Sequence, residues 1–127
     1  MTGEKPTIVI VTTHAALGAV YERHLERFAK VVLLPEIAEF ERNAIRLHAK
    51  ALAIDFVGED EGGILVKQIR ALRKKPVMKQ LHIAVLCKRA SSALVDTLHG
   101  AGVNDIILTT HQTPRSVAQR LHNLLLL

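Results

Sequence analysis

The chain has 127 residues, of which 49% are hydrophobic and 23% are charged, and its formal net charge is +5. This length predicts one domain over residues 1–127, and the composition excludes a disordered chain. A single cysteine excludes an internal disulfide and a cysteine-based zinc cluster. The N-terminus shows no signal-peptide pattern and no apolar run reaches the length of a membrane span. We therefore expect a cytoplasmic protein that does not engage a membrane.

Short apolar runs alternate with helical patterns five times along the chain. The runs that predict strands cover residues 7–11, 30–34, 51–57, 81–86 and 103–108. Between them, apolar residues recur at helical spacing, and the inner stripes are Leu17, Val20, Tyr21, Leu25 and Phe28; Ile37, Phe40, Ala44 and Leu47; Leu65, Ile69 and Leu72; Leu94, Val95, Leu98 and Ala101; and Val117, Leu121, Leu124 and Leu125.

Capping and breaking residues predict where several of these helices begin and end. The first helix is expected over residues 15–29, and Pro35 opens the second. Pro76 should end the third helix, because the residue before a proline disfavours helical backbone. Ser91 or Ser92 is a good N-cap for the fourth helix, with Gly100 and Gly102 at its end, and Thr113 followed by Pro114 is a good start for the last.

Five strands alternating with five helices predict the α/β class, with a parallel sheet and helices on both of its faces. In such sheets the functional crevice lies at the carboxyl ends of the strands. Candidate site residues are therefore expected directly after each strand.

Three segments carry a resemblance to a known family. The run Ala49–Asp55, the glycine Gly63 that follows it, and the turn Gly102-Val103-Asn104-Asp105 resemble a response-regulator receiver domain. The resemblance implies a single doubly wound, five-stranded parallel sheet, flavodoxin/CheY-like, with strand order 2-1-3-4-5. It also implies that Asp55 matches the phosphoacceptor at the end of the central strand.

Three positions depart from the chemistry of that family. Thr12 and Thr13 stand where receivers carry the acidic pair that holds Mg²⁺, an ion that usually requires carboxylates. Cys87 replaces a hydroxyl residue after the fourth strand, and Thr109 replaces a lysine after the fifth. Groups that stabilise phosphoryl transfer electrostatically are therefore missing, although Lys88 could supply a cation. The chain is similar to a degenerate receiver, or pseudo-receiver, with no metal, no cofactor and no enzymatic activity.

The cysteine and the histidines that follow strands are interpreted without a redox or metal-binding role. Cys87 is expected to be a small buried apolar residue rather than a redox-sensitive thiol. His14 and His111 both follow strands, but two ligands are too few to predict a metal site.

Three functions remain open. The leading hypothesis is a stand-alone signalling or scaffolding module that binds proteins through the face formed, by the resemblance, by the fourth helix, fifth strand and fifth helix, including residues 91–100 and 114–127. The first alternative is a phosphorylatable response regulator that uses Asp55 in a two-component phosphorelay. The second is a basic adaptor that binds nucleic acid through residues 67–89, which is less favoured because no aromatic residues accompany the charges.

The C-terminus suggests a homodimer. At about 100° per residue, Leu126 and Leu127 cannot both lie on the stripe of the last helix, so at least one should meet solvent or another chain. Either they form a frayed end, or they form a self-complementary patch that Leu94, Leu98 and Val117 would have to join.

Overall fold

The computed structural model of the protein describes residues 4–57 and 63–127, so most of the loop between the third strand and third helix lies outside the described residues. The elements in chain order are β1 (Thr7–Val11), α1 (Ala15–Leu25), β2 (Lys30–Leu34), α2 (Ile37–Leu47), β3 (Ala49–Asp55), α3 (Gly63–Arg73), the 3₁₀ helix η1 (Pro76–Met78), β4 (His82–Cys87), α4 (Ser92–Ala101), β5 (Asp105–Leu108) and α5 (Pro114–Leu125). Within the described part, no helix has the length and hydropathy to cross a membrane.

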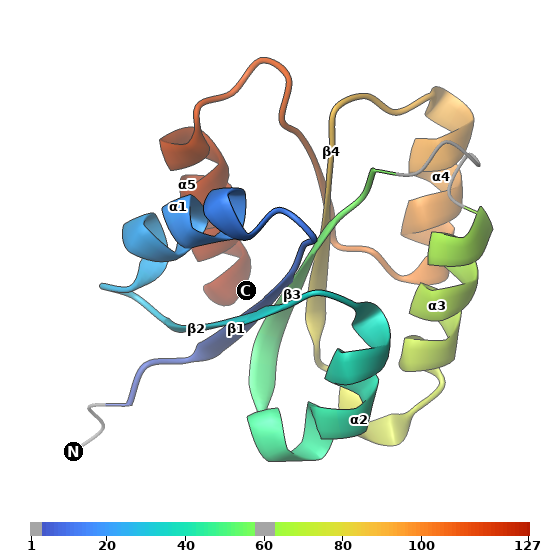
Figure 1. Ribbon diagram of the computed structural model, residues 1–127. Coiled ribbons are helices and arrows are strands. Elements are labelled where there is room, and N and C mark those ends of the chain that lie inside the picture. The colour runs from blue at the N-terminus through green and yellow to red at the C-terminus, as the bar shows by residue number, and fades with distance from the viewer. Residues whose placement is uncertain (1–3, 58–62) are drawn as a thin grey trace.

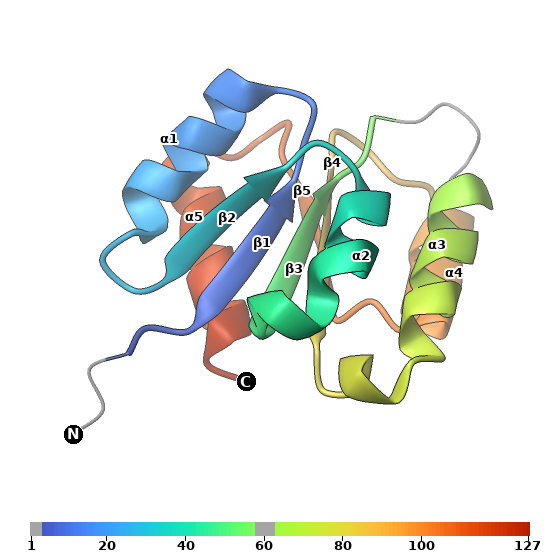
Figure 2. The same cartoon turned by 60° about the horizontal axis from the view of Figure 1, so that its bottom comes forward.

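The five strands form one parallel sheet in the order β2-β1-β3-β4-β5 (Figure 1), which confirms the predicted strand order. Helices α1 and α5 cover one face, and α2, α3 and α4 cover the other (Figures 1 and 2). Alternate residues of β1 enter the two layers: Ile8 and Ile10 pack under α1 and α5, whereas Val9 and Val11 pack under the other three helices. Because both faces are covered, the strands read as unbroken apolar runs.

Strand boundaries differ from the predicted ones by about two residues. β3 begins at Ala49, because Ala49 pairs with Thr7, and it ends at Asp55 rather than Val57. The backbone N–H of Phe56 still donates to the carbonyl of Leu86 at 2.8 Å, but Val57 has left the sheet and is 61% exposed. β4 is shifted by one residue, covering 82–87 instead of 81–86, and β5 begins two residues later than predicted, covering 105–108.

The first helix is shorter than predicted, and its apolar stripe is narrower. It ends at Leu25 rather than residue 29, because the N–H groups of Phe28 and Ala29 both donate to the carbonyl of Leu25 and close a turn. Phe28 therefore does not belong to the inner stripe. Its ring instead stacks on His122 of α5, with centroids 4.0 Å apart. Val20 is also on the outer side of α1, at 37% exposure, so the prediction was wrong for both residues.

The capping predictions are confirmed at three helix ends. Ser91, and not Ser92, accepts a hydrogen bond from the N–H of Leu94 at 3.1 Å, and Thr113 accepts one from Ser116 at 3.1 Å. Gly102 ends α4 with φ at 111°, a left-handed conformation that glycine adopts without strain. Gly100, by contrast, lies within α4 and does not mark its end.

The C-terminal leucines behave as helical geometry predicts. Leu121, Leu124 and Leu125 are buried, whereas Leu126 and Leu127 are 70% and 67% exposed. The residues proposed to join them in a contact patch cannot do so, because they are buried beneath their own helices: Leu94, Leu98 and Val117.

Candidate functional site

The candidate site is at the carboxyl edge of the sheet. Asp55 is the last residue of β3, the central strand, and it pairs with Leu86 of β4. On the other side of β3, Val11 of β1 pairs with Ile54, so the next residue, Thr12, arrives beside Asp55. The parallel register therefore brings together side chains that are far apart in the sequence.

Asp55 is held by one of the two predicted threonines. The hydroxyl of Thr12 donates to Oδ2 of Asp55 at 2.8 Å, and its oxygen accepts the N–H of His14 at 3.0 Å. Thr12 is buried, and it is the one buried polar side chain of the described residues. Thr13 is exposed, and no hydrogen bond from it to Asp55 occurs among the described contacts. The hydroxyl of Thr12 thus occupies one carboxylate oxygen without adding negative charge.

A cleft of about 600 Å³ opens on the side of Asp55 that faces β4 and β5. Asp55, Cys87, Lys88 and Thr109 all line it, so four of the predicted site positions meet in one place. Four further lining residues belong to the segments that were expected to form the crevice: His14, Phe56, Val57 and Arg89. The sequence analysis did not predict Ala16 and Leu17, which line the cleft from the start of α1.

Thr109 is hydrogen-bonded to the backbone of Cys87, and no hydrogen bond joins either residue to Asp55 among the described contacts. The backbone N–H of Thr109 donates to the carbonyl of Cys87 at 2.8 Å, and the Thr109 hydroxyl donates to the same oxygen at 3.4 Å. Cys87 is 3% exposed, which confirms the expectation of a buried residue. Burial raises the pKa of its thiol above the ordinary value, so the thiolate is suppressed near neutral pH.

Stability is expected to fall at alkaline pH. Burial raises the pKa of Cys87 above 9.0, and burial together with the nearby carboxylate of Asp55 raises that of Tyr21 above 10.0. The folded state then holds protons that the unfolded state releases, so stability present below pH 9.0 is lost as the pH rises through the folded-state values. Urea unfolding from pH 7 to 11 measures this effect, and Cys87→Ala should flatten the first part of the decline. A stability that rises over this range would contradict the prediction.

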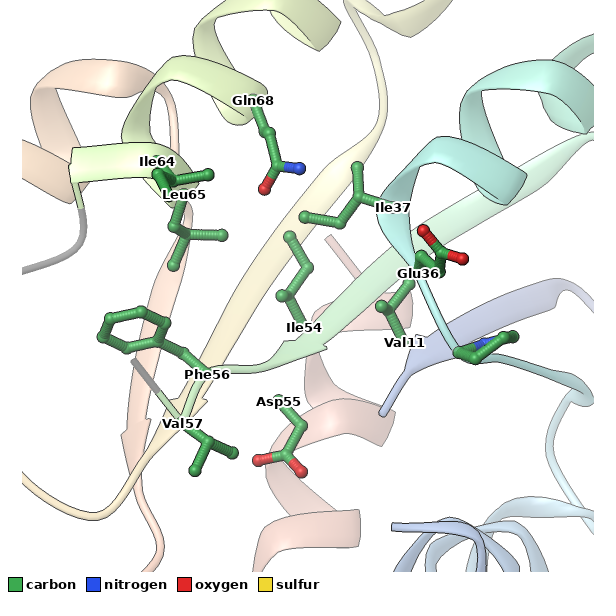
Figure 3. A pocket seen from close by; sticks show the side chains of 11 residues that line it. Val11, Glu36, Ile37, Ile54, Asp55, Phe56, Val57, Ile64, Leu65 and Gln68 are labelled. Carbon is green, nitrogen blue, oxygen red and sulfur yellow. The ribbon is translucent and has the colours of Figure 1, made fainter. Parts of the chain in front are cut away.

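A second cavity, of about 550 Å³, lies on the opposite side of Asp55 (Figure 3). It opens over the ends of β1 and β3, between the first residues of α2 and of α3. Its lining is mostly apolar, and three of its residues are shared with the first cleft: Asp55, Phe56 and Val57. The sequence analysis did not predict this cavity.

The basic residues of 67–89 do not form one surface. Lys74 and Lys79 precede β4, whereas Lys88 and Arg89 follow it, so these two pairs lie at opposite ends of the strand. Arg73 points inward and donates to backbone carbonyls. A nucleic-acid backbone would therefore meet only part of this charge at a time.

No metal centre is apparent in the part of the chain that the structure describes. Within 4–57 and 63–127, no three His, Cys, Asp or Glu side chains are grouped so that they could hold an ion. His14 lines the first cleft, and His111 is exposed in the turn before α5.

Comparisons with known proteins extend the structural description. No family model matches the chain, and no curated protein matches its sequence. Among solved structures, a response regulator from Thermotoga maritima superposes with a TM-score of 0.81 at 19% identity, covering 97% of this chain and 99% of that one. A chemotaxis response regulator of Vibrio cholerae gives 0.78 at 13% identity, covering 94% and 98%.

A third similar structure carries a different kind of name. A candidate pilus-assembly-related protein from Burkholderia pseudomallei gives a TM-score of 0.75 at 18% identity, covering 99% of this chain and 92% of that one. At such identities a likeness establishes the fold alone. Strand order, helix placement and these superpositions agree, and the chain has the CheY-like receiver fold.

Proposed function

We propose that the chain is a receiver-like signalling or scaffolding module that acts through protein contacts and does not accept a phosphoryl group with the help of Mg²⁺. The observation that supports this most directly is the hydrogen bond from Thr12 to Asp55. Mg²⁺ requires a nearly octahedral set of oxygen ligands, usually including one or two carboxylates. Beside Asp55 the chain offers neutral hydroxyls, one of which already uses its proton to bind the carboxylate.

The electrostatics of the cleft support the same proposal. Phosphoryl transfer depends on positive groups that neutralise charge on the transferred oxygens. The hydroxyl of Thr109 donates to a backbone carbonyl, and the thiol of Cys87 is a weak donor. Lys88 lines the cleft and is exposed, so a phosphorylatable regulator that uses Asp55 stays as the alternative.

The proposed partner surface is the face made by α4, β5 and α5. β5 is an edge strand of the sheet, and its last residue, Leu108, is 41% exposed. The guanidinium of Arg120 on α5 forms a salt bridge with Asp105 of β5 at 2.5 Å, which joins the helix to this edge. A partner that binds here would cover an exposed leucine and the outer edge of the sheet.

The proposed lack of Mg²⁺-dependent phosphorylation can be tested with beryllofluoride, which mimics a phosphoryl group on aspartate. Adding beryllofluoride and Mg²⁺ to the isotopically labelled chain should leave the amide NMR spectrum unchanged. The matched variant carries Thr12→Asp, Thr13→Asp and Thr109→Lys, which restores the carboxylate pair and the lysine. This variant should show saturable shifts around Asp55, and the further change Asp55→Asn should abolish them.

Saturable shifts in the unmodified chain that disappear in Asp55→Asn would refute the proposal and favour the phosphorelay alternative. Cross-linking in the native cell tests whether the chain binds proteins through the proposed surface. Proteins cross-linked to α5 or β5 would support the proposal. Nucleic acid cross-linked to residues 67–89 would instead favour the basic adaptor.

A further inference from the structure

The second cavity has the size and lining of a small-molecule site. Its volume of about 550 Å³ falls within the range of roughly 300–1,000 Å³ that is typical of ligand pockets. Its floor consists of buried side chains from the ends of β1 and β3 and from the first turns of α2 and α3: Val11, Ile37, Ile54 and Leu65. In the view of Figure 3, the side chains of Ile37, Ile54 and Leu65 gather around the middle of the pocket. A floor of packed core residues is preformed and does not have to be ordered by a ligand.

The rim of the cavity leaves apolar surface in water. Val57 is 61% exposed and Ile64 is 66% exposed, although both line the cavity. A ligand with an apolar body would cover this surface, and burying apolar area contributes about 25 cal/mol per Å². The apolar part of the lining therefore favours a hydrophobic ligand body.

The polar part of the lining is acidic. The described lining residues include the carboxylates of Asp55 and Glu36 and the amide of Gln68, but no Lys, Arg or His. The ion pairs of residues 4–57 and 63–127 join Lys75 to Glu41 and Arg120 to Asp105, so neither lining carboxylate is neutralised by one of them. Thr12 binds Oδ2 of Asp55, which leaves Oδ1 without a hydrogen bond among the described contacts.

The helix ends beside the cavity only partly offset this charge. α2 begins at Ile37 and α3 begins at Gly63, and each helix N-terminus carries roughly +0.5 of an elementary charge. The described lining of this cavity therefore keeps a negative balance, while the cations Lys88 and Arg89 line the neighbouring cleft that shares Asp55. An anion would be repelled, and an uncharged apolar molecule would bury carboxylates without a partner, which is costly. Among residues 4–57 and 63–127, no three His, Cys, Asp or Glu side chains are grouped to hold a metal ion.

We infer that this cavity binds a small organic cation: an aryl- or alkylammonium whose apolar body lies over Val57 and Ile37 and whose nitrogen donates to Asp55. The inference does not rest on the proposed partner surface, which lies on other elements of the fold. It gives Asp55 a binding role in its unmodified form.

The test is an NMR titration of the labelled full chain with 2-phenylethylammonium. We expect saturable amide shifts at Val57, Leu65 and Gln68, with a dissociation constant on the order of 1 mM, as is usual for a fragment of this size. The uncharged 2-phenylethanol, which has nearly the same shape, should bind at least tenfold more weakly. The anion 3-phenylpropionate should not shift these amides.

Variants separate the charge of Asp55 from its structural role. Asp55→Asn keeps an oxygen for the hydroxyl of Thr12 but removes the charge, and it should weaken binding of the ammonium probe at least tenfold. Glu36→Gln removes the other lining carboxylate, at an exposed position, and should also weaken binding of the ammonium probe. This variant provides the test if Asp55→Asn does not fold. Asp96→Asn on the exposed side of α4 is the matched control and should bind like the unmodified chain. Equal affinity for the alcohol and the ammonium, shifts that map elsewhere, or no saturable shifts would each overturn the inference.

Discussion

Replacing Arg73 with methionine is expected to lower the free energy of unfolding by about 2–4 kcal/mol, a large effect for a side chain that is only partly buried. Arg73 is at the end of α3, and its guanidinium joins three separate segments. Nη1 donates to the carbonyls of Met78 at 2.9 Å and Leu81 at 2.6 Å. Nε and Nη2 donate to the carbonyl of Gly102 at 3.1 and 2.7 Å.

The bonds of Arg73 continue through Asn104, whose side-chain oxygen accepts from Nη2 at 3.1 Å and from the N–H of Ile83 at 2.8 Å. Gly102 permits this approach, because a Cβ at that position would come within 2.8 Å of Nε. Methionine keeps the apolar stem but leaves several carbonyls without their donor, and unsatisfied acceptors cost about 1–3 kcal/mol each where water cannot replace the bond. Burial also lowers the pKa of Arg73, although not enough to remove its charge near neutral pH.

Urea unfolding measures the effect, and Arg70→Met is the matched control. Arg70 is on the same helix but is exposed, so its replacement should change stability by no more than about 0.5 kcal/mol. Equal unfolding midpoints for the two variants, at equal slopes, would show that the carbonyls regain their hydrogen bonds from water.

Replacing Leu121 with alanine should cost about 2–5 kcal/mol, whereas the same change at Leu126 should cost less than about 0.5 kcal/mol. The two residues are on the same C-terminal segment, but Leu121 is fully buried under the sheet and Leu126 is 70% exposed. Truncating Leu121 leaves a cavity within the core cluster that α5 shares with the sheet, which includes Ile107 and Val117. Thermal or urea unfolding of both variants gives the comparison.

The Leu126 variant also tests the predicted homodimer. If the chain is a monomer, neither the unmodified chain nor Leu126→Ala should change in stability with protein concentration. A stability that falls on dilution for the unmodified chain but not for Leu126→Ala, together with a faster-sedimenting species for the unmodified chain at tens of micromolar, would identify the exposed leucines as a subunit contact.

Local sequence patterns were sufficient to predict most of the fold. The alternation of apolar runs and helical stripes predicted the five strands, because a strand covered on both faces is apolar along its length. The strand order was implied by the resemblance to receiver domains. Ser91 and Thr113 were found as caps because a cap bonds to an N–H three residues away, which is a local interaction. Asp55 was placed at the end of the central strand by the resemblance to receiver domains, whereas the apolar run alone predicted a strand that continued to residue 57.

Contacts between distant segments were beyond those patterns. Phe28 was assigned to the core from its spacing, yet it stacks on His122 near the other end of the chain. Arg73 was counted among surface charges, because its carbonyl partners belong to segments that only the folded chain brings together. The choice of Thr12 over Thr13 as the partner of Asp55 also depends on the pairing of β1 with β3.

The cavity beside Asp55 shows most clearly the difference between what the sequence predicts and what only the folded chain reveals. The sequence by itself determined that Asp55 lies in or at the end of a buried strand and that apolar residues precede and follow it. Only the tertiary structure decided that Val57 and Glu36 share one cavity with Asp55. The physical reason is that periodicity reports which side of its own element a residue occupies, whereas a cavity forms where several elements, packed in register, leave space between them.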